Sequence, residues 1–298
     1  MAPIFPSISV VLLLVWTSAA FCENDPLFLV PTSWVADRLN DPTLVLLHVG
    51  TRDQYDSNHI PGAHFIALSD ISTRREEGSV VLELPSVAHL DSVFESVGIS
   101  DDSRIVVYYG GDWISPSARV YLTLDYLGLG NQTSIMDGGM QAWVGEGNPT
   151  TSAQPAQRKG SFNPQPRPDV IVTLEWVKEN LENPAIALID SRNTEFYTGE
   201  DLGNSVRRGH LPGARSVPFT EMVDDSLRFK GKAELREILV AGGLSDERTA
   251  VSYCHIGQQA SLTYFVARYL GYEARMYDGS MNEWSRYPDL PMVAEEQQ

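Results

Sequence analysis

Cysteine is scarce in this chain of 298 residues, which contains only Cys22 and Cys254. If a leader that includes Cys22 is removed, neither an intramolecular disulfide nor a thiolate metal cluster can form, and we expect no metal and no cofactor. Basic residues are also few, since 22 Lys and Arg stand against 39 Asp and Glu and give a formal net charge of −17. This charge argues against nucleic acid and against an anionic membrane surface as partners.

The N-terminal apolar run, Ile8–Trp16, is too short to span a membrane, which takes about 20 apolar residues. Small residues follow the run, and this succession is typical of a secretory signal peptide. We therefore predict that residues 1–22 are a signal peptide that is cut after Ala20 or Cys22. An uncleaved anchor is the alternative. After cleavage the protein is expected to be periplasmic or secreted and to have no membrane partner.

The sequence contains an internal duplication. The segment Trp34–Pro42 matches Trp176–Pro184, and two further pairs repeat: His59–Ala63 with His210–Ala214, and Asp137–Trp143 with Asp278–Trp284. Such self-similarity indicates two homologous domains. We place them at residues 25–147 and 160–298, joined by a linker at 148–159 whose Pro, Gln, Ser and Thr residues are typical of surface segments.

Apolar runs alternate with helical patterns in both copies. This alternation predicts βαβ units, and hence an α/β fold in which each domain is a parallel sheet flanked by helices. The predicted strands are 44–48, 104–109 and 134–136 in the first copy, and 186–189, 249–253 and 274–277 in the second. The two His-x-Pro-Gly-Ala segments are predicted turns, in which His59 and His210 act as hydrogen-bonding residues of the turn.

Cys254 lies between the strand pattern that ends at Tyr253 and the helical pattern that begins at Ala260. Ligands bind at the carboxyl ends of strands in open α/β sheets. Backbone N–H groups of residues 255–259 and the positive end of the following helix would surround the sulfur, and such surroundings lower the pKa of a thiol. We therefore predict that Cys254 is a nucleophile. The alternative is a buried apolar cysteine without a role in chemistry.

The two copies differ at the positions that would carry this chemistry. Asp112 stands opposite Cys254, and Gly50 stands opposite Arg192. The first copy therefore lacks both the nucleophile and the cation. We expect the first domain to form one wall of the site and to cover apolar surface.

With its doubled His-x-Pro-Gly-Ala turn, its Tyr277–Trp284 segment and a cysteine loop in the second copy alone, the chain resembles a two-domain rhodanese-type sulfurtransferase. The resemblance covers nearly all of residues 25–298. It implies that Cys254 takes a sulfur atom from thiosulfate or 3-mercaptopyruvate, carries it as a persulfide, and passes it to an acceptor such as a thiol or cyanide. The implied partners are thus a small anionic sulfur donor and a thiol or cyanide acceptor.

The resemblance also implies residues that bind the donor. Arg192 is a candidate contact for the anion, or alternatively an ion-pair partner of Glu195 or Asp190. Arg207 and Arg208 could replace a second arginine that some members have where this chain has Tyr197. The remaining candidates are the loop residues His255, Ile256, Gly257, Gln258 and Gln259. A partly cationic His255 modestly favours thiosulfate over 3-mercaptopyruvate.

Two other functions are possible for such a loop. Cell-cycle phosphatases share this fold, but their loop has an Arg six residues after the Cys, where this chain has Ala260. Without that guanidinium a phosphate dianion would lose its main partner. A non-catalytic module that only carries a persulfide or docks a partner is the other alternative. Turnover, compared with stoichiometric sulfur loading, would separate it from an enzyme.

Overall fold

The computed structural model describes residues 27–73 and 80–294. The predicted signal peptide at residues 1–22, including Cys22, lies outside these ranges and stays a prediction. Within them, no helix combines the length and apolar character that crossing a bilayer requires. Nor do three His, Cys, Asp or Glu side chains come together there in a way that could hold a metal ion.

The first sheet is parallel throughout and has the strand order β1-β5-β4-β2-β3. Its strands are β1 (Leu29–Val30), β2 (Leu44–Val49), β3 (His64–Ile66), β4 (Arg104–Tyr109) and β5 (Thr133–Met136). The connecting helices are α1 (Thr32–Ala36), α2 (Arg52–Ser57), α3 (Val87–Ser96), α4 (Ser115–Tyr126) and α5 (Gly139–Gly145), with 3₁₀ turns η1 (Leu68–Ile71) and η2 (Gly130–Gln132).

The second sheet repeats this topology in the order β6-β10-β9-β7-β8. Its strands are β6 (Ile171–Val172), β7 (Ile186–Asp190), β8 (Arg215–Ser216), β9 (Thr249–Tyr253) and β10 (Ala274–Tyr277). The helices are α6 (Leu174–Asn180), α7 (Thr194–Thr198), α8 (Lys232–Ala241), α9 (Ala260–Tyr269) and α10 (Ser280–Trp284), with 3₁₀ turns η3 (Pro168–Val170) and η4 (Phe219–Met222). The predicted α/β fold with two parallel sheets is confirmed.

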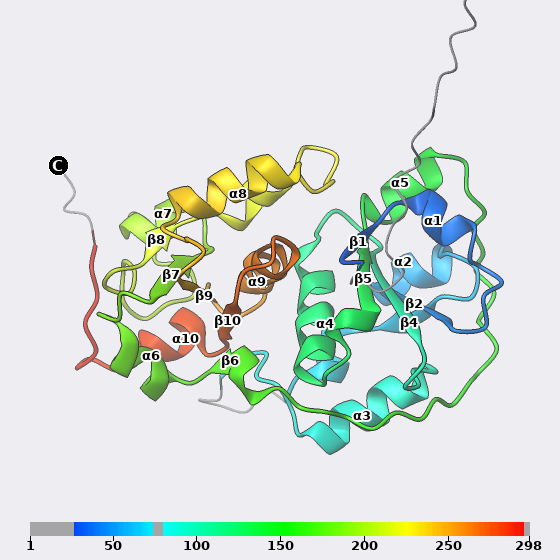
Figure 1. Ribbon diagram of the computed structural model, residues 1–298, viewed down its shortest axis with the longest axis horizontal. Coiled ribbons are helices and arrows are strands. Elements are labelled where there is room, and N and C mark those ends of the chain that lie inside the picture. Colours follow the sequence, from blue (N-terminus) through cyan, green and yellow to red (C-terminus); the bar gives the residue numbers. More distant parts are fainter. Residues whose placement is uncertain (1–26, 74–79, 295–298) are drawn as a thin grey trace, which may run out of the picture.

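The two domains pack through α4 and α9, which lie side by side between the sheets (Figure 1). Both helices are buried along most of their length, because each covers its own sheet and also faces the other helix. Tyr121 of α4 meets Phe265 of α9 edge to face, with ring centroids 4.8 Å apart. One hydrophobic cluster therefore continues from the first domain into the second.

The chain leaves the first domain later than the predicted boundary at residue 160. Phe162 is buried in the hydrophobic core of the first domain. The amides of Gly160, Gln165 and Arg167 donate to backbone carbonyls of that domain. Figure 1 shows this segment running along the outside of the first domain before it enters β6. The physical reason is that one aromatic ring and a few backbone hydrogen bonds suffice to fix an otherwise polar stretch.

The two His-x-Pro-Gly-Ala segments form turns, as predicted. His59 Nδ1 contacts the Tyr55 carbonyl at 2.6 Å, and His210 Nδ1 contacts the Tyr197 carbonyl at 2.8 Å. Each imidazole stacks on the ring of the same tyrosine. Each turn thereby fixes the chain that enters β3 or β8.

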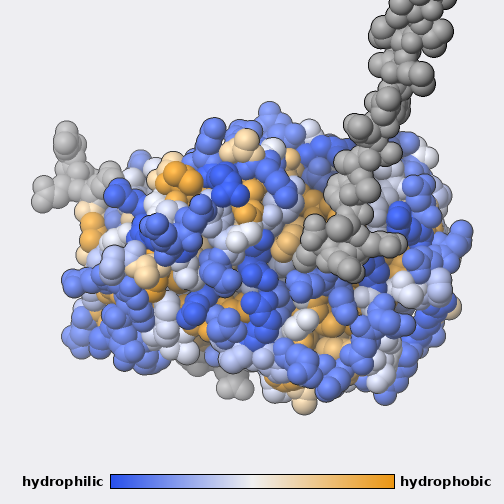
Figure 2. All heavy atoms as spheres, viewed as in Figure 1, coloured by the Kyte–Doolittle hydropathy of each residue, from blue (hydrophilic) through white to orange (hydrophobic). Residues whose placement is uncertain are grey.

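On the face seen in Figure 2, polar residues predominate and hydrophobic residues form small, separate patches.

Candidate active site

Cys254 directly follows β9, the central strand of the second sheet, and its side chain is fully buried at 0% exposure. It is a free thiol. The loop after it turns at Gly257, whose φ of +80° favours glycine, and then enters α9. The register pairs Tyr253 of β9 with Asp190 of β7, so the segments that follow both strands start at the same edge of the sheet. This arrangement brings Cys254 and Arg192 together.

Two opposing effects act on the pKa of the Cys254 thiol. Burial disfavours the charged thiolate and is the larger effect, so the pKa lies above its ordinary value. The amide N–H groups of Ile256, Gly257, Gln259 and Ala260 face the sulfur and lower the pKa. The predicted net lowering is therefore wrong, because the apolar surroundings outweigh the loop amides. Those amides nevertheless form an anion-stabilising cradle.

The segment 278–282 makes hydrogen bonds to the backbone of the cysteine loop. The Cys254 amide donates to the Ser280 hydroxyl at 3.1 Å, while the Met281 and Asn282 amides donate to the carbonyls of Cys254 and His255 at 3.0 and 2.8 Å. Ser280 has an unusual φ of +49° for a non-glycine residue. Such a conformation persists when its surroundings fix it. The segment 278–282 is thus a rigid support for the loop that begins at Cys254.

Arg192 is buried in an ion pair with Asp190, the alternative that the sequence left open. Nε donates to Oδ1 at 2.9 Å and Nη2 donates to Oδ2 at 2.6 Å, while Nη2 also donates to the Gly209 carbonyl at 2.8 Å. Nη1 is left without a hydrogen bond within the described residues. The positive charge of Arg192 acts on both Cys254 and His255. Contact between Nη1 and a bound donor stays a prediction.

His255 is neutral at physiological pH, contrary to the expected partial charge. Burial, followed by repulsion from Arg192, lowers the pKa of His255 to about 4. The imidazole lies edge-on to Phe196, with ring centroids 4.6 Å apart. A histidine beside a buried guanidinium cannot easily accept a second positive charge. His255 therefore adds no positive charge to that of Arg192 beside the loop amides.

The neutral His255 makes a testable difference to pH dependence. From about pH 5 to about pH 8, sulfur loading should rise with ionisation of Cys254 and should show no falling limb from an imidazolium. His255→Gln should keep the same shape. Alkylation by iodoacetamide, followed by mass spectrometry on the peptide that contains Cys254, measures the thiolate fraction alongside the rate. A falling alkaline limb in the wild type that His255→Gln removes would contradict this interpretation.

A cavity of about 360 Å³ lies at the carboxyl edge of the first sheet, and the cysteine loop borders it through Gln258. Gln258 is the loop residue that lines this cavity. The other lining residues belong to the first domain and include Gly50, Asp112 and Trp113. Trp113 is 50% exposed and so lies at the mouth. The first domain thus forms a wall beside Gln258, and its part in a donor site stays a prediction. Gln258 reaches this wall, whereas Ile256, Gly257 and Gln259 act through their amides.

The corresponding position in the first domain has a neutral imidazole in place of the ion pair. His48 replaces Asp190, is fully buried, and contacts the Tyr108 hydroxyl at 3.1 Å through Nδ1. Burial lowers the pKa of His48 to about 4. With Gly50 in place of Arg192, this position carries no positive charge. The sequence comparison between the copies predicted that difference.

Arg208 is exposed, and its Nη1 donates to the carbonyls of Gly199 and Glu200. The neighbouring Arg207 donates to the carbonyls of Trp284, Ser285, Tyr287 and Leu290. Both arginines thereby close loops around α7 and α10. A donor contact through Arg208 stays a prediction that these hydrogen bonds do not support.

The comparisons with known proteins agree with this arrangement. The family model described as "Rhodanese-like domain" matches residues 31–146 and again 173–287. The chain belongs to the rhodanese-like family. Its two copies, with the cysteine loop in the second, give it the tandem form of the rhodanese-type sulfurtransferases.

Several relatives cover nearly the whole chain. "Sulfur carrier protein TtuD" of Thermus thermophilus is 32% identical over 291 residues, which cover 91% of this chain and 98% of the relative. In Pseudomonas aeruginosa, a "thiosulfate sulfurtransferase" is 28% identical over 90% of this chain and 97% of its own length. A "probable 3-mercaptopyruvate sulfurtransferase" of the same organism is 31% identical over 89% of this chain and 97% of its own.

Two solved structures illustrate the likeness in fold. YnjE superposes with a TM-score of 0.81 and 22% identity over 90% of this chain and 68% of that one. Wild-type EanB superposes with a TM-score of 0.80 and 22% identity over 90% of this chain and 69% of that one. At this identity they support the fold alone.

Three residues at the site escaped sequence reasoning: Ser280, Asp278 and Arg119. Ser280 carried a usable signal, because the first copy has Gly139 at the same place in the repeated segment. Arg119 is the one basic residue of the buried helix α4, and the second copy has Ser261 there. A charge at such a position indicates either a buried pair or a function.

Proposed function

We propose that this protein is a sulfurtransferase that moves a sulfane sulfur from a small anionic donor to a thiophilic acceptor through a persulfide on Cys254. The observation that carries the proposal is the ring of four loop amides around a single buried thiol at the end of β9. The sulfurtransferase names of relatives that match this chain over most of its length support it.

In the first half-reaction the Cys254 thiolate attacks the outer sulfur of thiosulfate. A new S–S bond forms on Cys254, the S–S bond of thiosulfate breaks, and its electron pair leaves with sulfite. The charges balance, because a thiolate and a dianion give a persulfide anion and a dianion. The amides of residues 256, 257, 259 and 260 and the N-terminus of α9 are placed to stabilise the persulfide anion.

In the second half-reaction the acceptor attacks the outer sulfur of the persulfide. With cyanide the new bond is the C–S bond of thiocyanate, and the electron pair of the persulfide S–S bond returns to Cys254 as a thiolate. A thiolate acceptor would leave as a persulfide by the same electron movement. We propose that donor and acceptor approach through the cavity at Gln258, which lies against the cysteine loop.

We propose thiosulfate as the donor, with 3-mercaptopyruvate as the alternative. His255 does not distinguish the two donors by charge, because its pKa of about 4 leaves it neutral. Loop amides and Arg192 suit a sulfonate and a carboxylate alike. The relatives include proteins named for each donor, so the two donors must be compared directly.

The deciding experiment is the mass of the protein after each donor. Thiosulfate should add the mass of one sulfur to the peptide that contains Cys254, and cyanide should remove it as thiocyanate. Rates with thiosulfate and with 3-mercaptopyruvate at one fixed salt concentration then rank the donors, since exposed charges are screened by salt. An unchanged mass with both donors would contradict the proposed function.

A stoichiometric sulfur carrier is the second candidate. The Thermus thermophilus relative named as a sulfur carrier and the complete burial of Cys254 favour it. A carrier would load one sulfur and exchange it only with a protein partner. Many turnovers with thiosulfate and free cyanide would exclude it, whereas a single loading without turnover would favour it.

A further inference from the structure

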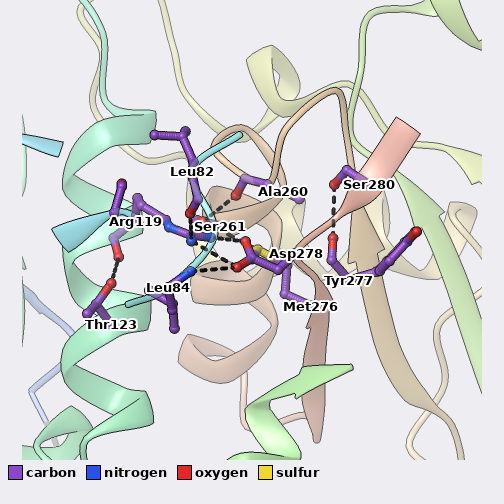
Figure 3. Close-up of polar contacts among 12 residues, drawn as sticks. Leu82, Leu84, Arg119, Thr123, Ala260, Ser261, Met276, Tyr277, Asp278 and Ser280 are labelled. Carbon is purple, nitrogen blue, oxygen red and sulfur yellow. Dashed lines mark hydrogen bonds and ion pairs between the residues drawn. The ribbon is translucent and has the colours of Figure 1, made fainter. Parts of the chain in front are cut away.

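A buried ion pair crosses the boundary between the two domains next to the cysteine loop. Arg119 lies on α4 of the first domain and is 0% exposed. Its Nη1 donates to Asp278 Oδ1 at 2.6 Å, and its Nη2 donates to Asp278 Oδ2 at 3.2 Å. Figure 3 shows the guanidinium reaching from α4 to Asp278, with Leu82 and Leu84 beside it.

The first-domain segment that contains Leu82 and Leu84 also hydrogen-bonds to Asp278 and to Arg119. The Leu84 amide donates to Asp278 Oδ2 at 3.2 Å, and Arg119 Nη2 also donates to the Leu82 carbonyl. One residue earlier, the Val81 amide donates to Asn282 Oδ1 at 3.3 Å. The first domain therefore makes hydrogen bonds to both ends of the segment 278–282, at Asp278 and at Asn282.

That segment is the support of the cysteine loop. Ser280 accepts the Cys254 amide, and Met281 and Asn282 donate to the carbonyls of Cys254 and His255. Asp278 itself touches the turn of the loop, because a Cβ added at Gly257 would lie 2.7 Å from Asp278 Oδ1 and 3.2 Å from Arg119 Nη1. The Gly257 amide is one of those that face the sulfur. A continuous chain of contacts therefore links Arg119, through Asp278 and Gly257, to the amides that face the sulfur of Cys254.

The chemistry of the pair suits a positioning role. A guanidinium presents its donors in a planar fork and so fixes the orientation of a carboxylate as well as its place. Removing one partner would leave the other charge buried. Arg119 Nε is buried without a partner within the described residues, so the pair with Asp278 and the Leu82 carbonyl takes all of its hydrogen bonding.

We propose that Arg119 is a positioning residue for sulfur transfer: through Asp278 it fixes the segment 278–282 and the turn at Gly257, and so keeps the loop amides aimed at the sulfur of Cys254. The proposal rests on the proposed function. It assigns the first domain, which has no nucleophile, a direct part in the geometry of the active site.

The test compares Arg119→Met, Arg119→Lys and Asp278→Asn in the full-length chain. In Arg119→Met the single-turnover rate of persulfide formation at saturating thiosulfate should fall by about tenfold or more, with a smaller change in the thiosulfate concentration for half-maximal rate. The pH midpoint for alkylation of Cys254 should move upward, because misaligned amides stabilise the thiolate less. Arg119→Lys should fall between Met and wild type, since it keeps the charge without the fork.

Asp125→Asn is the matched control. Asp125 is another buried carboxylate of the first domain that crosses the interface, and it accepts the Tyr264 hydroxyl of α9 at 2.5 Å. It has no contact with the segment 278–282 in the described structure. The control should lower the midpoint of urea unfolding but leave the rate of persulfide formation and the alkylation midpoint unchanged.

A double variant, Arg119→Met with Asp278→Leu, separates positioning from stability. An apolar pair removes both buried charges and should regain the urea midpoint lost in Arg119→Met. Because it cannot orient the segment, its transfer rate should stay low. Recovery of the rate together with stability, or an equal loss of rate in Asp125→Asn, would overturn the proposal. So would an unchanged alkylation midpoint in both Arg119→Met and Asp278→Asn. Alkylation needs no sulfur donor, so this readout stays valid even if the wild type fails to form a persulfide.

Discussion

Cys254→Ser is expected to reduce sulfur transfer by at least about a thousandfold while the protein keeps its fold. A serine hydroxyl ionises far less readily than a thiol and attacks sulfur poorly. No side-chain base hydrogen-bonds to residue 254 in the described structure, where its backbone contacts are to Ser280 and Met281. The loop amides would remain, but they would have no sulfur anion to stabilise.

Cys22→Ser is the natural control, because Cys22 is the other cysteine of the chain. It should accept one sulfur from thiosulfate and turn over with cyanide like the wild type. Circular dichroism and the urea midpoint of Cys254→Ser should match the wild type, since the two side chains differ little in volume. Transfer retained by Cys254→Ser but lost in Cys22→Ser would move the nucleophile to the N-terminal segment and refute the assignment.

The central strands were predictable because parallel strands covered by helices on both faces give continuous apolar runs. This pattern fixed 104–109 and 249–253 as strands, and the structure has β4 and β9 at those residues. The edge strands β1 and β6 have two residues each, too few to show a period. They exist because they pair with β5 and β10, which no local pattern reveals.

The position of Cys254 was predictable, but its electrostatics were not. A strand, a glycine loop and a helix place the sulfur of Cys254 at the carboxyl edge of the sheet wherever the rest of the chain lies. The pKa values of Cys254 and His255 depend on burial, and the neighbours that cover His255, Phe196 and Gly203, lie about 50 to 60 residues before it in the sequence. Arg119 and Asp278 are 159 residues apart, and a single sequence gives no sign of such a pairing.

Arg192→Met is expected to destabilise the fold strongly, because Asp190 would remain buried without its cation. Asp190 is 0% exposed and accepts three side-chain hydrogen bonds from Arg192. Breaking a buried pair from one side costs about 3–5 kcal/mol of unfolding free energy. Urea unfolding measures this loss. The double variant Asp190→Asn with Arg192→Met should recover much of it, since neither charge then remains.

The double variant also decides whether Arg192 binds the donor. The ion pair with Asp190 uses Nε and Nη2 of Arg192 and does not use Nη1. The positive charge of Arg192 also acts on Cys254. If Nη1 contacts thiosulfate, the stable double variant should need about tenfold or more thiosulfate for half-maximal persulfide formation, the cost of one charge-assisted contact. An unchanged requirement would mean that Arg192 only shapes the site. The amides around Cys254 would then carry the donor's charge alone, which is physically reasonable for a cradle of four N–H groups at the start of α9.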